Sequence, residues 1–115
     1  MEFRSLGELQ VSVVGLGCNN FGMRLDIDDT KRVVDAAIDA GINYFDTAES
    51  YGKGLSEEYL GKAIKGRRDQ VIVASKWGHT VSLEEGERGG DPAQIRARLD
   101  ASLARLGTDY IDHYQ

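Results

Sequence analysis

The feature that most constrains the fold is a regular alternation of short apolar runs with longer amphipathic segments. Apolar residues recur at helical spacing in three segments, 28–41, 56–66 and 91–107, and a glycine closes each one. Runs rich in β-branched and aromatic residues precede, separate and follow them, at 11–17, 42–45, 70–75 and 110–115. Residues 1–11 read as a hairpin turning at 6–9. This order predicts an α/β fold in which a parallel sheet is covered by helices.

Capping residues mark where the predicted helices begin. Asp28 and Ser56 are good N-caps for the first two helices, and Glu57 follows Ser56 as an acid in the first turn. Asp91 followed by Pro92 gives the third helix an N-cap with proline at its first position.

Candidate acid/base residues lie where two neighbouring strands end. The run 42–45 stops at Asp46, the run 70–75 stops at Lys76, and Tyr51 lies in the loop after Asp46. Chemistry in parallel α/β proteins is done at the carboxyl ends of strands. A phenol is a poor acid at neutral pH, but a nearby ammonium stabilises its anion, and an aspartate keeps that ammonium charged. The three side chains together suit protonation of a carbonyl oxygen while its carbon accepts hydride.

Each of these residues also has a structural interpretation. An aspartate after a strand is often a turn former, a lysine there can be a solvated loop residue, and a tyrosine can pack at the rim. The coincidence of all three at matched strand ends favours the site.

Two architectures fit the alternation: an open doubly wound sheet and part of a (β/α)₈ barrel. Gly15 and Gly17 after a strand match the first two glycines of a dinucleotide fingerprint, which would make the chain an open-sheet nucleotide-binding module. The third glycine position is Asn20, however, and polar residues separate Gly17 from the predicted helix. A loop of that length is normal at the mouth of a barrel, so the barrel explains more.

The chain resembles the N-terminal half of the aldo-keto reductases, a family of NADPH-dependent (β/α)₈-barrel enzymes. The resemblance covers essentially the whole chain, and the residues that carry it are the hairpin 1–12 and the segments 14–17, 41–52, 55–63, 75–78 and 103–112. It implies that residues 1–115 are one incomplete domain, a hairpin followed by (βα)₃β, the first half of a TIM barrel.

The resemblance also implies roles for individual residues. Tyr51 would be the proton donor, with Lys76 and Asp46 tuning it. Gly17, Cys18 and Asn19, together with Asp46, would lie near the nicotinamide ribose of NADPH or NADP. The substrate would be a small carbonyl or sugar-like compound.

Two departures from the family pattern bear on activity. The catalytic histidine of the family would fall two residues after Gln115, and His113 is a packing residue by this register. His79 is expected to be solvated or at the substrate rim, in a long loop that is a candidate lid. A barrel needs about 250 residues. We therefore expect the chain alone to be inactive and to self-associate, as a possible homo-oligomer, through its open edges. The rival hypothesis is a non-catalytic half-barrel or interaction module.

Composition narrows the other functional classes. The chain has 41% hydrophobic and 29% charged residues, which is typical of a globular protein. Its net charge of -5 and the lack of a basic run argue against nucleic-acid binding, and no apolar stretch is long enough to span a membrane. Cys18 is the only cysteine, so neither a disulfide nor a metal site is expected. With no signal-peptide pattern at the N-terminus, these features predict a cytoplasmic protein.

Overall fold

The computed structural model describes residues 1–78 and 91–115. The elements in chain order are β1 (Phe3–Leu6), β2 (Leu9–Ser12), β3 (Leu16–Gly17), α1 (Ile27–Asp39), β4 (Tyr44–Asp46), the short 3₁₀ helix η1 (Tyr51–Gly54), α2 (Leu55–Ala63), the 3₁₀ helix η2 (Arg68–Gln70), β5 (Ile72–Ser75), α3 (Pro92–Leu106) and β6 (His113–Tyr114).

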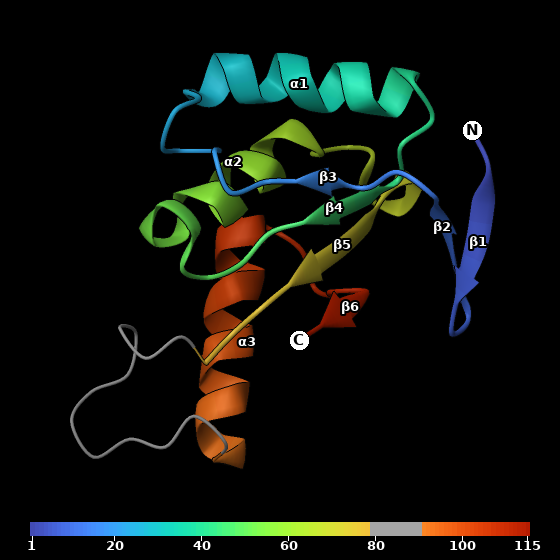
Figure 1. The fold of residues 1–115 in the computed structure, drawn as a ribbon. Coiled ribbons are helices and arrows are strands. Elements are labelled where there is room, and N and C mark those ends of the chain that lie inside the picture. Colours follow the sequence, from blue (N-terminus) through green and yellow to red (C-terminus); the bar gives the residue numbers. More distant parts are fainter. Residues whose placement is uncertain (79–90) are drawn as a thin grey trace.

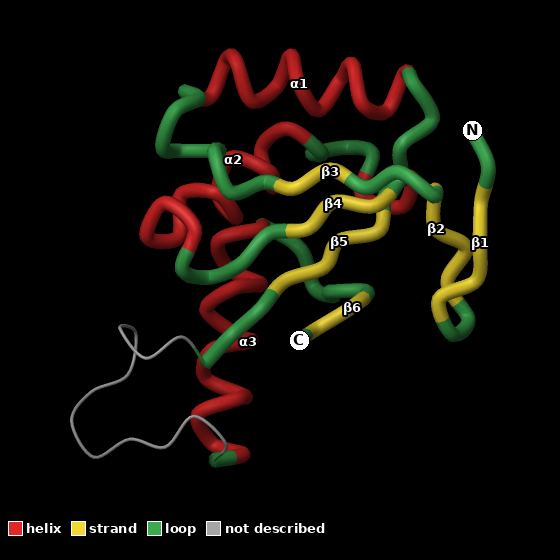
Figure 2. Tube along the Cα trace, in the orientation of Figure 1, coloured by secondary structure: helices red, strands yellow, loops and turns green. Residues whose placement is uncertain are grey.

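The central sheet is parallel, with its strands in the order β3-β4-β5-β6. Figure 1 shows α1, α2 and α3 following one another along the same side of this sheet, with the β1–β2 hairpin beside it. The colouring of Figure 2 makes the alternation of strand and helix along the chain explicit. The predicted α/β fold, with a hairpin followed by (βα)₃β, is confirmed.

The two faces of the sheet differ in burial. Phe45 and Val73 are fully buried and pack with residues of all three helices in the apolar core. Tyr44 and Ile72, their neighbours in sequence and partners in register, are half-buried and belong to the opposite face. On that face the Tyr44 hydroxyl lies 2.8 Å from Nδ1 of His113 in β6. His113 thus has a polar partner in addition to the packing predicted for it.

Asn43 ties the hairpin to the start of β4. Its side-chain oxygen accepts a hydrogen bond from the Ser12 backbone at 2.7 Å, and its amide donates to the Gln10 carbonyl at 2.9 Å. The Ser12 hydroxyl also accepts from the Asn43 backbone at 3.0 Å. One amide side chain therefore fixes the hairpin against the sheet.

Two helices begin earlier than predicted. Asp26, not Asp28, caps α1, and its carboxylate accepts the Asp29 N–H at 2.8 Å. Gly54, not Ser56, is the N-cap of α2, with φ of 94°. A positive φ strongly favours glycine, and the Ser56 side chain is buried inside the protein instead.

The outer strands are shorter than predicted. Only Leu16–Gly17 of the run 11–17 pairs with β4, while Val13 and Val14 are exposed. At the other edge, Tyr110 is exposed and only His113–Tyr114 joins the sheet. β-branched composition indicates extended backbone, but pairing also needs a neighbouring strand in register.

Helices α2 and α3 pack at backbone contact. A Cβ atom added at Gly61 would lie 2.3 Å from the Leu106 carbonyl oxygen. The missing side chain at residue 61 therefore sets how closely α2 approaches α3.

Candidate active site

The parallel register brings Asp46 and Lys76 to the same edge of the sheet. Asp46 is the last residue of β4 and is paired with Ala74 of β5, and Lys76 follows directly after that strand. Tyr51 begins η1, which leads into α2. Three residues that are distant in sequence are therefore delivered to one rim.

Lys76 is the centre of the group. Its Nζ atom donates to Asp46 Oδ1 at 2.6 Å and to the Thr47 carbonyl at 2.9 Å. The same atom lies 3.5 Å from the Tyr51 hydroxyl and 5.1 Å from the centre of the tyrosine ring. The structure therefore brings together all three residues that the sequence proposes as catalytic.

The electrostatics of this group keep the ammonium charged. Partial burial lowers the pKa of Lys76, but the hydrogen bond and negative charge of Asp46, with a further contribution from Tyr51, outweigh it and raise the pKa above 10.5. A charged donor beside the phenol stabilises the negative charge that develops on the phenol oxygen as its proton leaves.

A pocket of about 340 Å³ lies next to the group. Tyr51 and Lys76 line it, together with Glu49, Trp77 and Gly78. The Glu49 carboxylate accepts the Gly78 N–H at 3.3 Å, which joins the loop after β4 to the segment after β5. The rest of the predicted lid, including His79, lies outside the described residues.

The residues proposed to contact the cofactor lie beside Asp46. Gly17 pairs with Asp46 across β3 and β4, and the Cys18 N–H donates to the Asp46 carbonyl at 2.9 Å. Gly17 and Asn19 are exposed, whereas the Cys18 side chain is fully buried. Burial and the nearby Asp46 raise the pKa of the Cys18 thiol to about 12, so this cysteine stays a neutral thiol. Only Gly17 and Asn19 of these three present an open surface to a ligand.

Sequence reasoning missed a layer of buried polar side chains directly behind the rim. Thr47, Ser56, Glu57 and Ser75 are all fully buried on the helix-facing side of the sheet. The only sequence signal was the pair Ser56 and Glu57 at the start of a helix, and it was interpreted as capping.

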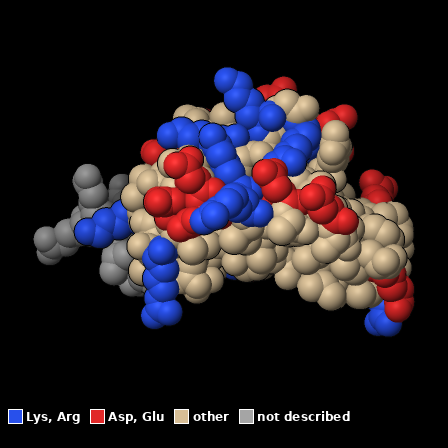
Figure 3. Space-filling view, turned by 90° about the horizontal axis from the view of Figure 1, so that it is seen from above, with Lys and Arg blue, Asp and Glu red and all other residues tan. Residues whose placement is uncertain are grey.

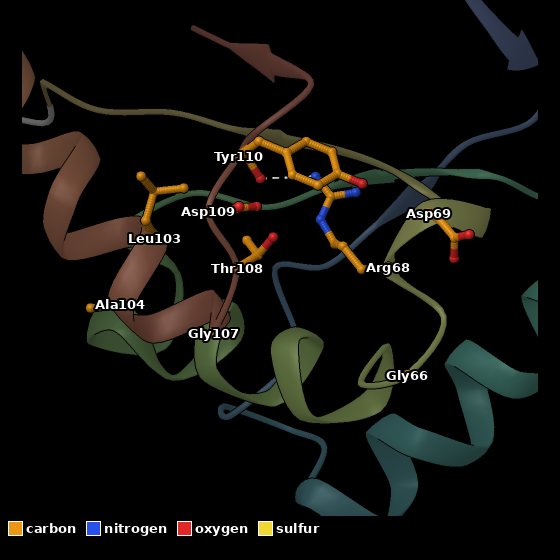
Figure 4. Close-up of a pocket in the computed structure, with 9 residues that line it drawn as sticks. All are labelled: Gly66, Arg68, Asp69, Leu103, Ala104, Gly107, Thr108, Asp109 and Tyr110. Atoms are coloured by element: carbon orange, nitrogen blue, oxygen red, sulfur yellow. Dashed lines mark hydrogen bonds between the residues drawn. The ribbon is translucent and has the colours of Figure 1, made fainter.

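A larger pocket of about 840 Å³ lies at the opposite end of the strands. Figure 4 shows the Arg68 guanidinium beneath the Tyr110 ring, and the two are 3.8 Å apart. Arg68 also pairs with Asp112 at 2.7 Å. The amino ends of barrel strands serve stability rather than catalysis. The smaller pocket, next to Lys76 and Tyr51, is therefore the better candidate site.

Charges of both signs lie on the face of the molecule seen from above. Figure 3 shows basic and acidic side chains intermixed on this face. The ion pairs of the protein include Arg67 with Asp35 and Arg32 with Asp29. Within residues 1–78 and 91–115, no helix has the length and apolar character needed to cross a bilayer. In the same part of the chain, no three His, Cys, Asp or Glu side chains form a group that could hold a metal ion.

The sheet is half of a barrel, and its carboxyl edge carries the Asp46, Tyr51 and Lys76 group. A sequence model of the Aldo/keto reductase family matches residues 13–115. The chain belongs to this family.

Individual relatives agree with this assignment. The chain is 43% identical over 121 residues to the oxidoreductase YqkF and 41% identical over 123 residues to the aldo-keto reductase YhdN, both of Bacillus subtilis (strain 168). Among solved structures, it matches the holo form of the aldo-keto reductase AKR11C1 from Bacillus halodurans with a TM-score of 0.85 and 45% identity.

These matches cover all of the chain but only part of each relative. The shares covered are 38% of YqkF, 37% of YhdN and 39% of the AKR11C1 chain. The chain therefore spans less than two-fifths of the length of these relatives. Its four parallel strands are half of the eight in a (β/α)₈ barrel.

Proposed function

We propose that this chain supplies the proton-transfer residues of an NADPH-dependent reductase of small aldehydes and ketones. The observation that carries the proposal is the position of Lys76 Nζ, 2.6 Å from Asp46 Oδ1 and 3.5 Å from the Tyr51 hydroxyl. The proposed catalytic residues are Asp46, Tyr51 and Lys76.

The residues present suit the nicotinamide end of the cofactor. A Cβ atom at Gly17 would meet only the Asn19 side-chain oxygen, at 4.0 Å, so open space lies beside Asp46 at the rim. The adjoining pocket of about 340 Å³ is near the lower limit of ligand sites, which suits a small carbonyl compound or one ring rather than a dinucleotide. Gly17, Asn19 and Asp46 would contact the ribose next to the nicotinamide.

The chemistry divides between cofactor and protein. NADPH, when bound, supplies the hydride that reduces the carbonyl carbon. The Tyr51 hydroxyl donates a proton to the carbonyl oxygen as negative charge develops there. The Lys76 ammonium stabilises the resulting phenolate, and Asp46 orients the ammonium. The same steps in reverse oxidise an alcohol.

Because the chain spans less than two-fifths of its relatives, the test combines it with the remainder of one of them. Residues 1–115 replace the matching segment of YhdN, and NADPH oxidation is followed with a panel of aldehydes. We expect turnover, and we expect Tyr51→Phe to lower kcat by about 10²–10⁴-fold, since positioned proton transfer contributes that much.

Tyr59→Phe is the matched control, because Tyr59 lies on α2 outside the pocket and its loss should leave kcat unchanged. The 115-residue chain alone should consume no NADPH. An inactive chimera beside an active YhdN, or a Tyr51→Phe chimera as active as its parent, would refute the proposal and favour a non-catalytic module.

The chain on its own is proposed to self-associate in a reducing compartment such as the cytoplasm. Strands β3 and β6 each have one strand neighbour in the described residues, and the face bearing Tyr44, Ile72 and His113 is only half-buried. Unpaired strand edges favour pairing with a second copy. Light-scattering chromatography should show a mass above 12.6 kDa that falls on dilution, and a sharp monomeric peak would contradict this.

A further inference from the structure

Two consecutive residues of α2 contact the two strand ends that carry the acid/base group. Ser56 and Glu57 lie in the first turn of α2, behind the sheet, on the side opposite the Lys76 ammonium. We propose that Ser56 and Glu57 are positioning residues that set the spacing between Asp46 and Lys76.

The Ser56 hydroxyl fixes the end of β4. It donates to the Cys18 carbonyl at 2.7 Å and lies 2.8 Å from the Thr47 hydroxyl. A hydroxyl has one proton, so Thr47 must be the donor to Ser56. Thr47 follows Asp46, and the Cys18 N–H donates to the Asp46 carbonyl. Ser56 therefore bonds to the residue that follows Asp46 and to the residue of the neighbouring segment whose N–H donates to Asp46.

The Glu57 carboxylate fixes the end of β5. Its Oε1 atom accepts from the Ser75 hydroxyl at 2.6 Å, and its Oε2 atom accepts from Arg105 Nε at 2.6 Å. Ser75 directly precedes Lys76. Arg105 supplies the charge that a buried carboxylate needs, since Glu57 has an exposed fraction of 0%.

Helix geometry explains how two adjacent residues of α2 can reach the ends of two neighbouring strands. Successive side chains on a helix diverge by about 100° because there are 3.6 residues per turn. Neighbouring strands lie about 4.8 Å apart, so two adjacent side chains can reach two adjacent strands. Tyr51 is linked to the same turn, because η1 runs directly into α2. The start of α2 therefore relates all three proposed catalytic residues.

Stability alone does not account for these polar contacts. Leu60 and Ala63 anchor the same helix by apolar packing. Polar groups in a buried layer cost desolvation, and well-packed apolar residues of similar volume often stabilise as much or more. What a hydrogen-bonded network adds is one defined geometry.

The test measures the environment of the Lys76 amine, so it requires no turnover. Asp46 and Lys76 are catalytic residues only under the proposed function. The labelling of Lys76 nevertheless reports its position whether or not the protein has reductase activity. The full 115-residue chain is acetylated with limiting acetic anhydride, and mass spectrometry gives the labelling of Lys76 relative to Lys62, which lies on the last turn of α2.

Thr47→Val and Ser75→Ala each remove one hydroxyl contact and keep the ion pair between Glu57 and Arg105. Displacing Lys76 from Asp46 lowers the pKa of the amine and exposes it, so relative labelling should rise about threefold or more in both variants. In folded Glu57→Gln protein, the labelling of Lys76 relative to Lys62 should rise as well.

Ser102→Ala is the control. Ser102 is also fully buried and accepts from Arg105 at 3.2 Å, but it contacts neither strand end. Its relative labelling should match that of the wild type. Unchanged labelling in Thr47→Val and Ser75→Ala overturns the proposal. An equal rise in Ser102→Ala also overturns it, because the effect would then reflect general loosening of the fold.

Discussion

Two pairs of an aspartate with a cation lie at opposite ends of the same sheet. Lys76 and Asp46 are 2.6 Å apart at the carboxyl ends of the strands, and Arg68 and Asp112 are 2.7 Å apart near the amino ends. The side chains of the first pair are 32% and 35% exposed, whereas both side chains of the second are 15% exposed.

The surroundings of the two pairs differ more than their distances. Arg68 also donates to the Val71 and Tyr110 carbonyls, and Asp112 also accepts the Val73 N–H. The rigid guanidinium is thus fixed by several partners and by the tyrosine ring above it. The Lys76 ammonium, a compact charge on a flexible stem, lies beside an open pocket and a phenol. The Arg68–Asp112 arrangement suits a structural role, and the Lys76–Asp46 arrangement leaves room for chemistry.

Neutralising each aspartate in turn should give the largest difference in stability between the two pairs. Asp112→Asn leaves a nearly buried guanidinium without its charge partner, so the free energy of unfolding should fall by about 3 kcal/mol. Asp46→Asn removes a partner from a pair that is about one-third exposed, and it should cost less than about 1 kcal/mol. Urea unfolding of both variants measures the difference. Equal losses would show that the two pairs have the same structural role.

High pH should also distinguish the two pairs, by a smaller change in the free energy of unfolding. Although burial lowers it, the pKa of Lys76 is raised in the fold by Asp46. The stability that this pair contributes is therefore fully present below the ordinary lysine pKa of 10.5 and is lost as pH rises through the higher folded value. A guanidinium stays charged over this range.

Unfolding free energies should be compared between the wild type and Lys76→Met, and between the wild type and Arg68→Met, at about pH 8 and about pH 11.5. The Lys76 difference, at most about 1 kcal/mol, should shrink toward zero, and the Arg68 difference should persist. Burial, with Glu49 and Glu57, raises the pKa of Tyr114 to about 12, so overall stability also falls as pH rises from 10 to 12. That loss is common to all three proteins and cancels in the differences. If the unfolding free energies of the wild type and Lys76→Met differ by the same amount at both pH values, the ion pair between Lys76 and Asp46 is not the source of that difference.

The order of elements was predictable because periodicity reports which side of each segment is buried. Val34 and Ala37 on α1 and Leu60 on α2 are buried as predicted. Exact ends were less predictable, because they depend on contacts distant in sequence. Gly54 caps α2 through its positive φ, and Val13 and Val14 have strand composition but lie between β2 and β3 and belong to neither strand.

The candidate site was only partly predictable. Asp46, Lys76 and Tyr51 stand out because polar residues follow apolar strands. Glu57 did not stand out, because an acid in the first turn of a helix is ordinary in sequence. Its burial arises only when Arg105, distant in sequence, packs against it.

The contact at Gly61 has a consequence for how sequences of this kind can diversify. Adding one methyl group there would drive α2 away from the Leu106 carbonyl and carry Ser56 and Glu57 with it. A library that varied only the pocket lining would leave this position untouched. In a library that varied α2 freely, variants with a larger residue at position 61 would fail to pack correctly, even though none of their pocket residues had changed. Inherited change in the pocket is therefore more accessible in the rim loops than in the helix behind them.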